Sequence, residues 1–174
     1  MKRTSDAYTI PLQGLKEGMF DETLKIGKEF IDEQKVDGVY DADLSVKVHF
    51  VKQVDLHTLH LQLKGTVSVE CDRCLEIFAL PIEMNQEMIV KIGEQNDDLA
   101  EEENVIIVSS EETEFGISSI IYEMIMLSIP LKKVHKNEKD CNSDMMTYLK
   151  QSKKVKKEVK TDPRWDSLKN INFK

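Results

Sequence analysis

The chain has 174 residues, of which 40% are hydrophobic and only 6% aromatic, and its formal net charge is −8. This length suits one domain with appendages better than two full domains, and aliphatic side chains must fill most of its core. The sequence has no stretch of about 18 apolar residues, which excludes a membrane-spanning helix.

Three short elements are predicted at the N-terminal end. Residues 7–15 are apolar and contain Pro11, which cannot donate a hydrogen bond to a ladder, so they predict an edge strand. Residues 19–26 predict a second short strand. Residues 27–34 are ambiguous, although their composition is that of a helix.

Three long strands are predicted next. Apolar and polar residues alternate over 44–50 and again over 59–71, and the turn at 51–55 joins them into a long antiparallel hairpin. After residue 71 the apolar positions stay odd up to Pro81 and then become even. A change of phase at a proline predicts a bulge or a bend in the third strand.

The strongest helix signal follows an acidic segment. Residues 94–114 contain nine acidic residues and no basic one, which predicts an exposed loop with a short strand at 105–108. Apolar residues at helical spacing over 117–128 predict an amphipathic helix, and Pro130 ends it. The sequence therefore predicts an α+β fold, in which one main helix accompanies an antiparallel meander or partly closed sheet.

A shorter helix is predicted at 144–150, with Ser143 or Asp144 as its N-cap. Residues 151–162 have the composition of a disordered segment, and apolar residues at helical spacing within 162–173 predict a last short helix.

Charge divides the chain into an acidic body and a basic tail. Residues 150–174 contain nine Lys/Arg and three Asp/Glu, a net charge of +6, which leaves −14 for residues 1–149. We therefore expect an acidic domain at 1–149 and a basic, largely disordered tail at 150–174. Such tails often contact nucleic acid or an acidic partner, although they also serve as solvated linkers. The candidate contact residues of the tail are Lys153, Lys154, Lys156, Lys157, Lys160, Arg164 and Trp165.

Cys71 and Cys74 form a CxxC motif between two predicted strands. A redox pair of the thioredoxin type lies at the start of a helix, because the helix N-terminus lowers the thiol pKa. Here the motif leads from one predicted strand into another, which argues against redox catalysis. The odd cysteine count and the absence of a secretory signal argue against a disulfide framework and favour the reducing cytoplasm.

A second candidate ligand pair, His135 and Cys141, lies in the loop after the main helix. Together with the CxxC motif it would make a Cys₃His set, which suits structural zinc. The alternative is that Cys71 packs as a small apolar residue, Cys74 lies in a turn, and His135 is a surface residue.

No other constellation in the sequence indicates catalysis. There is no glycine-rich phosphate loop and no supported Ser-His-Asp order, so we expect neither an enzyme nor a small-molecule substrate. His49, His57 and His60 have no acid–base partner near them in sequence, and they are interpreted as solvent-facing or strand-end residues.

The order of these motifs resembles the YceD family, a domain of unknown function in bacteria and plastids. The resemblance rests on VECDRCLEIFALPIE at 69–83, the acidic loop, IIYEMIMLSIPLKKVH at 120–135, Cys141, and DPRWDSLKNI at 162–171. Many members carry a cysteine where His135 stands, and the cysteine-rich piece that follows it in them is absent here.

The resemblance implies a role in accumulation of 23S ribosomal RNA, with rRNA or a large-subunit ribosomal protein as partner and no established enzymatic activity. Two other hypotheses remain at this point. One is a thiol oxidoreductase that uses Cys71 and Cys74, and the other is an acidic adaptor that binds a basic protein without RNA.

Overall fold

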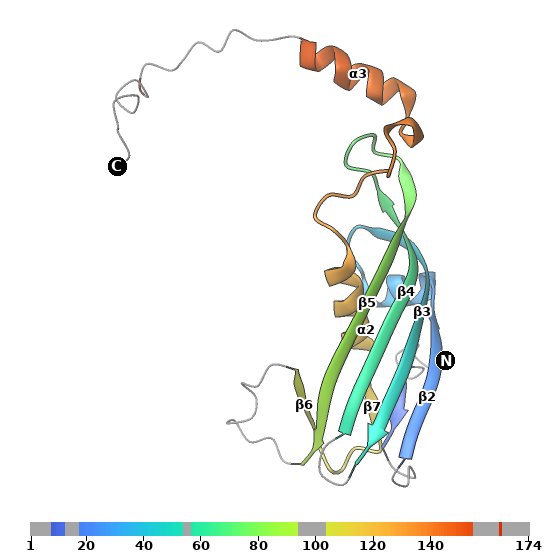
Figure 1. Ribbon diagram of the computed structural model, residues 1–174, viewed down its shortest axis with the longest axis vertical. Coiled ribbons are helices and arrows are strands. Elements are labelled where there is room, and N and C mark those ends of the chain that lie inside the picture. The colour runs from blue at the N-terminus through green and yellow to red at the C-terminus, as the bar shows by residue number, and fades with distance from the viewer. Residues whose placement is uncertain (1–7, 13–17, 54–56, 94–103, 155–163, 165–174) are drawn as a thin grey trace.

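The computed structural model describes residues 8–12, 18–53, 57–93, 104–154 and 164. These residues form an α+β fold with an open, mainly antiparallel sheet, a small second sheet and three α-helices (Figure 1). The α+β prediction is confirmed, but the sheet is not closed.

The main sheet has five strands in the order β2-β3-β4-β5-β6. Their bounds are β2 Gly18–Ile26, β3 Val39–Lys52, β4 His57–Glu70, β5 Ile77–Ile92 and β6 Val105–Val108. Neighbouring strands are antiparallel except β5 and β6, which pair in parallel. The predicted hairpin is confirmed as β3 and β4, whose alternating apolar residues are buried on one face of the sheet.

A second layer covers that inner face. Helix α2 (Ser118–Ser128) buries Ile120, Ile121, Met124 and Ile125 against it, and the amphipathic helix prediction is thereby confirmed. Helix α1 (Lys28–Gln34) adds Phe30 and Ile31 to the same core. Figure 1 shows both helices on one side of the sheet, so no helix of the described residues covers the outer face of β2 to β5.

The predicted N-terminal edge strand is confirmed as a short element. Strand β1 (Thr9–Pro11) pairs antiparallel with β7 (Glu114–Gly116) in a two-stranded sheet. The backbone N–H of Ile117 donates to the Tyr8 carbonyl at 2.9 Å, which ties this sheet to the start of α2.

The predicted bulge at Pro81 is wrong, and the alternative of a bend stays a prediction. The register of β4 and β5 runs without a shift through Pro81, and the irregularity of the sheet lies in β3, between Val39 and Asp41. The apparent phase change arises because Ile77 and Ala79 are apolar yet exposed on the outer face. Among the described strands only β4 pairs with this part of β5, so Pro81 lies on a free edge there, where proline is tolerated in sheets.

The C-terminal helix is longer than predicted. Helix α3 spans Ser143–Lys154 rather than 144–150, and it projects away from the end of the sheet in Figure 1. Its cap is Asn142, not Ser143 or Asp144, because the Asn142 side-chain oxygen accepts hydrogen bonds from two backbone N–H groups of the first turn. None of the described helices is long and apolar enough to cross a membrane.

Candidate metal centre

The CxxC motif occupies the tight turn that connects β4 to β5. Cys71 follows the last residue of β4, and its backbone N–H and carbonyl bond to Glu76 and Leu75 across the turn. Leu75 has a φ of 63°, a left-handed conformation that reverses the chain at this point. The turn places Cys71 and Cys74 on its inner side, where both are buried.

Two hydrogen bonds fasten this turn to the loop that follows α2. The backbone N–H of Asp72 donates to the Lys133 carbonyl at 2.7 Å, and the backbone N–H of Lys133 donates to the Asp72 carboxylate at 2.6 Å. This reciprocal pair brings the second half of the predicted site within reach of the first, although 61 residues separate Asp72 from Lys133 in the chain.

The loop then places His135 and Cys141 next to Cys71 and Cys74. The Nδ1 atom of His135 lies 3.6 Å from the sulfur of Cys74 and 3.5 Å from that of Cys141. A short 3-10 turn at Glu138–Asp140 returns the chain to the site, which explains how an HxxxxxC spacing can serve as a ligand pair. The ligand atoms of Cys71, Cys74, His135 and Cys141 all lie within 4.8 Å of one another.

These distances fit a tetrahedral zinc ion. Bonds of about 2.3 Å to sulfur and about 2.0–2.1 Å to nitrogen separate neighbouring ligand atoms by about 3.5–3.8 Å. The two N–S distances, 3.6 and 3.5 Å, agree with that range. Three thiolates and one imidazole are also a donor set that zinc prefers.

Side chains that the sequence reasoning missed surround the four candidate ligands. The Arg73 guanidinium donates to the sulfur of Cys141 at 3.6 Å, so it would offset the excess negative charge of three thiolates around a divalent ion. Phe78 stacks on His135 with ring centroids 4.5 Å apart. Val134, Met145 and Met146 pack against the cysteines, and this cluster is separate from the main core. Of these residues only Arg73 could have been suspected from the sequence, because it lies inside the CxxC motif.

The thiols of the metal-free cluster differ in acidity. Burial alone would raise the pKa of Cys71, but hydrogen bonds from the backbone N–H groups of Arg73, His135 and Cys74, and from the His135 side chain, together lower it to about 6. Burial raises the pKa of Cys141, and the neighbouring thiols of Cys74 and Cys71 raise it further, against the opposing effect of Arg73. One thiolate at neutral pH is a suitable first ligand for a metal ion.

The family profile described as Large ribosomal RNA subunit accumulation protein YceD matches residues 59–172. The chain belongs to the YceD family. The matched region is more than half of the chain and contains all four candidate ligands. A search of curated proteins gave no match for this YceD family member, and a search of solved structures gave none either.

Most of the predicted contact residues of the tail lie outside the residues that the structure describes. Residues 155–163 and 165–174 are not described, and these include Lys156, Lys157, Lys160 and Trp165. Lys153 and Lys154 form the last two positions of α3, and Arg164 is exposed. The role of these residues, like the division at residue 149, stays a prediction.

Proposed function

We propose that this chain is a non-enzymatic ribosome-biogenesis factor of the cytoplasm, which supports accumulation of 23S rRNA through contact with rRNA or a large-subunit ribosomal protein. The observation that carries the proposal is the YceD family match over residues 59–172, which includes both the CxxC turn and the basic tail. The described residues offer no arrangement that argues for catalysis beyond the thiol cluster itself.

Direct RNA contact would run through the tail. A net charge of −14 on residues 1–149 repels phosphate, whereas the +6 of residues 150–174 attracts it. The candidate contacts are Lys153, Lys154, Lys156, Lys157, Lys160, Arg164 and Trp165. The acidic body would instead suit a basic ribosomal protein, and in that version the tail is not required for binding.

Removing residues 155–174 tests the tail without shortening α3. We expect the truncated chain to lose salt-sensitive binding to 23S rRNA fragments. The slope of log binding constant against log salt concentration measures the number of phosphate contacts, at about 0.7 for each contact on a single strand. In the full chain this slope should fall by about 2 when three lysines are replaced together, in the variant Lys156→Gln, Lys157→Gln, Lys160→Gln. The matched control is Lys28→Gln on α1, which should leave the slope unchanged.

Undiminished rRNA binding by the truncated chain would contradict the tail assignment. Recovery of basic ribosomal proteins from nuclease-treated lysate, lost when Asp41 and Asp43 are neutralised, would favour the adaptor version. In cells, failure of the full chain to restore 23S rRNA levels in a strain that lacks it would contradict the biogenesis role itself.

We further propose that Cys71, Cys74, His135 and Cys141 hold a structural zinc ion. Zinc with four protein ligands has no open position, so it would supply a cross-link and no catalytic chemistry. The ligands come from the β4–β5 turn and from the loop before α3, so these two segments would be joined at the end of the sheet. Elemental analysis of protein purified without chelator should find about one zinc per chain, lost in Cys74→Ser. A content near zero in the unaltered chain would contradict the site.

A thiol oxidoreductase is the second candidate, since the pKa of Cys71 is lowered to about 6. Against it, Cys71 and Cys74 are 0% and 2% exposed, so a protein disulfide cannot reach them without opening of the turn. The CxxC motif also leads into a strand and not into a helix. Catalysed reduction of an insulin disulfide by the zinc-free chain, abolished in Cys71→Ser, would favour this reading over the structural one.

A further inference from the structure

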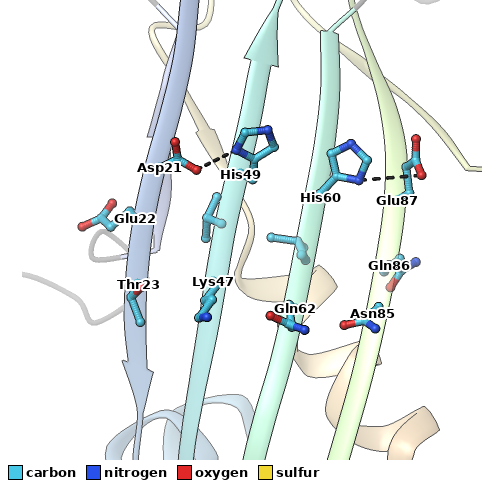
Figure 2. Close-up of a pocket in the computed structure, with 12 residues that line it drawn as sticks. Asp21, Glu22, Thr23, Lys47, His49, His60, Gln62, Asn85, Gln86 and Glu87 are labelled. Carbon is cyan, nitrogen blue, oxygen red and sulfur yellow. Dashed lines mark hydrogen bonds and ion pairs between the residues drawn. The ribbon is translucent and has the colours of Figure 1, made fainter.

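A row of four ionisable side chains crosses the open outer face of the sheet. Asp21, His49, His60 and Glu87 lie on β2, β3, β4 and β5 and are directly opposed from strand to strand (Figure 2). All four point to the outer face, because the neighbouring positions of β3 and β4, Val48 and Leu61, are buried in the core. The sequence contained no sign of this row, since its members are brought together only by the register of four strands.

Each imidazole in the row is paired with a carboxylate. The Nδ1 atom of His49 lies 2.6 Å from an Asp21 oxygen, and the Nδ1 atom of His60 lies 3.7 Å from a Glu87 oxygen. The short contact with Asp21 favours the His49 tautomer that carries its proton on Nδ1, so Nε2 is the nitrogen left for a metal ion, whereas Glu87 lies beyond hydrogen-bond distance of His60. Histidines that bind metals have this second-shell arrangement in most proteins.

The two rings are close enough to share one ion. Their centroids are 5.8 Å apart, and opposed residues of antiparallel strands have Cβ atoms about 4.5–5.5 Å apart. Two nitrogens on one tetrahedral zinc ion lie about 3.3 Å apart, so each ring must turn toward the other. Both rings have room for this rotation, because the His49 and His60 side chains are 40% and 45% exposed.

The surroundings allow a hydrated ion. The row lines a groove of about 680 Å³, whose floor continues into Lys47, Gln62 and Asn85 on the next row of the same face. Imidazole nitrogen suits zinc, nickel and copper better than magnesium or calcium, which prefer oxygen. Two imidazoles leave coordination positions for water, in contrast to the four-ligand set at the cysteine cluster.

We propose that His49 and His60 form an exchangeable binding site for a divalent transition-metal ion on the outer face of the sheet, with Asp21 as the hydrogen-bond partner of His49. Unlike the cysteine cluster, whose ligand atoms are already assembled, this site forms as the rings rotate, so its ion exchanges with solvent. The proposal does not depend on the role in rRNA accumulation.

Titration of Ni²⁺ into the zinc-replete, full-length chain tests the site, with imidazole NMR signals of the four histidines as the readout. Paramagnetic broadening should affect His49 and His60 first and leave the half-buried His135, beside the β4–β5 turn, sharp. His49→Gln and His60→Gln should each weaken Ni²⁺ binding by at least about tenfold, and Asp21→Asn by about tenfold, since second-shell partners contribute this much. Lys47→Gln, one row away on the same face, is the matched control and should not weaken binding.

Two outcomes would overturn the proposal. One is Ni²⁺ binding that is equally strong in the His49→Gln and His60→Gln variants. The other is an absence of broadening at His49 and His60 while Ni²⁺ remains in solution, which would leave the row as two cross-strand ion pairs that stabilise the sheet.

Discussion

Gly65 occupies a position of β4 at which no side chain fits. Its φ is 151°, and a Cβ atom there would collide with the Asp43 carbonyl oxygen and lie 2.8 Å from the Leu44 Cα of the neighbouring strand. Both contacts are backbone, so neither can move without displacing β3. The glycine therefore permits β3 and β4 to pair closely in the middle of the sheet.

We expect Gly65→Ala to lower the free energy of unfolding by about 3 kcal/mol, a cost typical of strain at a special backbone position. Urea unfolding followed by circular dichroism measures it. Gly116→Ala is the matched control, because nothing lies within 4 Å of its Cβ position, and it should change stability by less than about 1 kcal/mol. Equal effects of the two substitutions would show that the close approach of β3 is not the cause.

His57 is the buried histidine of the described residues, with 4% of its surface exposed, and it contacts the Phe50 ring. Burial, and then the charge of Lys52, lower the pKa of His57 below its usual value of 6.5. The unfolded chain therefore takes up a proton at this residue more readily than the folded chain does. The free energy of unfolding should fall as the pH drops below about 6.5 and continue to fall until the folded pKa is passed.

His57→Gln should flatten this part of the stability curve, which lies below about pH 6.5. Thermal unfolding followed by circular dichroism at a series of pH values provides the comparison. Gln62→Ala, on the exposed face of the same strand, should keep the slope of the unaltered chain. A slope that is the same in all three chains would mean that other groups cause the acid sensitivity.

At the scale of elements, Asn142 links the candidate metal centre to α3. Its side-chain oxygen accepts the N–H groups of Asp144 and Met145 at 3.0 and 3.2 Å, and its side-chain nitrogen donates to the Glu76 carboxylate at 2.8 Å. It directly follows Cys141, so the chain leaves the candidate ligand set and enters the helix within one residue. The direction of α3 is thereby set by the loop that carries the ligands.

Asn142→Ala should destabilise α3 by about 1 kcal/mol, the usual cost of losing an N-cap. Amide hydrogen exchange in the first turns of α3 should then accelerate about fivefold, while exchange in β3 and β4 is unchanged. Asn142→Asp keeps the cap oxygens and should restore protection, and Ser143→Ala should have no effect. If Asn142→Asp also lost protection, the stability of α3 would depend on the hydrogen bond from Asn142 to Glu76 and not on the cap.

The sequence predicted those elements whose pattern is local. Alternation over 44–50 and 59–71 predicted β3 and β4 because every second residue faces one continuous core. The same rule failed at Pro81, because Ile77 and Ala79 are apolar on the exposed face, and alternation alone cannot tell which face is buried. The Cys₃His set was predictable from residue types, but the Asp72–Lys133 hydrogen bonds that assemble it, and the row around His49 and His60, depend on long-range register.

At the scale of the whole molecule, the described residues form two hydrophobic clusters that meet at Phe78. The larger one lies between the inner face of the sheet and α2, whereas the smaller one consists of the three cysteines with Val134, Met145 and Met146. The aliphatic residues of β3, β4 and α2 hold the first cluster together without any contribution from a metal ion. The second has few apolar side chains of its own, so its stability should depend on the ion.

Removing the proposed zinc ion should therefore loosen one end of the molecule and leave the rest folded. On addition of a chelator, we expect amide exchange to accelerate across the β4–β5 turn, residues 131–142 and α3. Amides in the middle of β3 and β4 should stay protected, because the small cluster can unfold locally while the main core stays folded. Hydrogen-exchange mass spectrometry of the full chain, with and without one equivalent of Zn²⁺, measures this pattern. Addition of chelator to the Cys74→Ser variant is the control and should change nothing. Uniform acceleration across the whole sheet would show that the two clusters unfold as a single unit, and that the metal centre supports the entire fold.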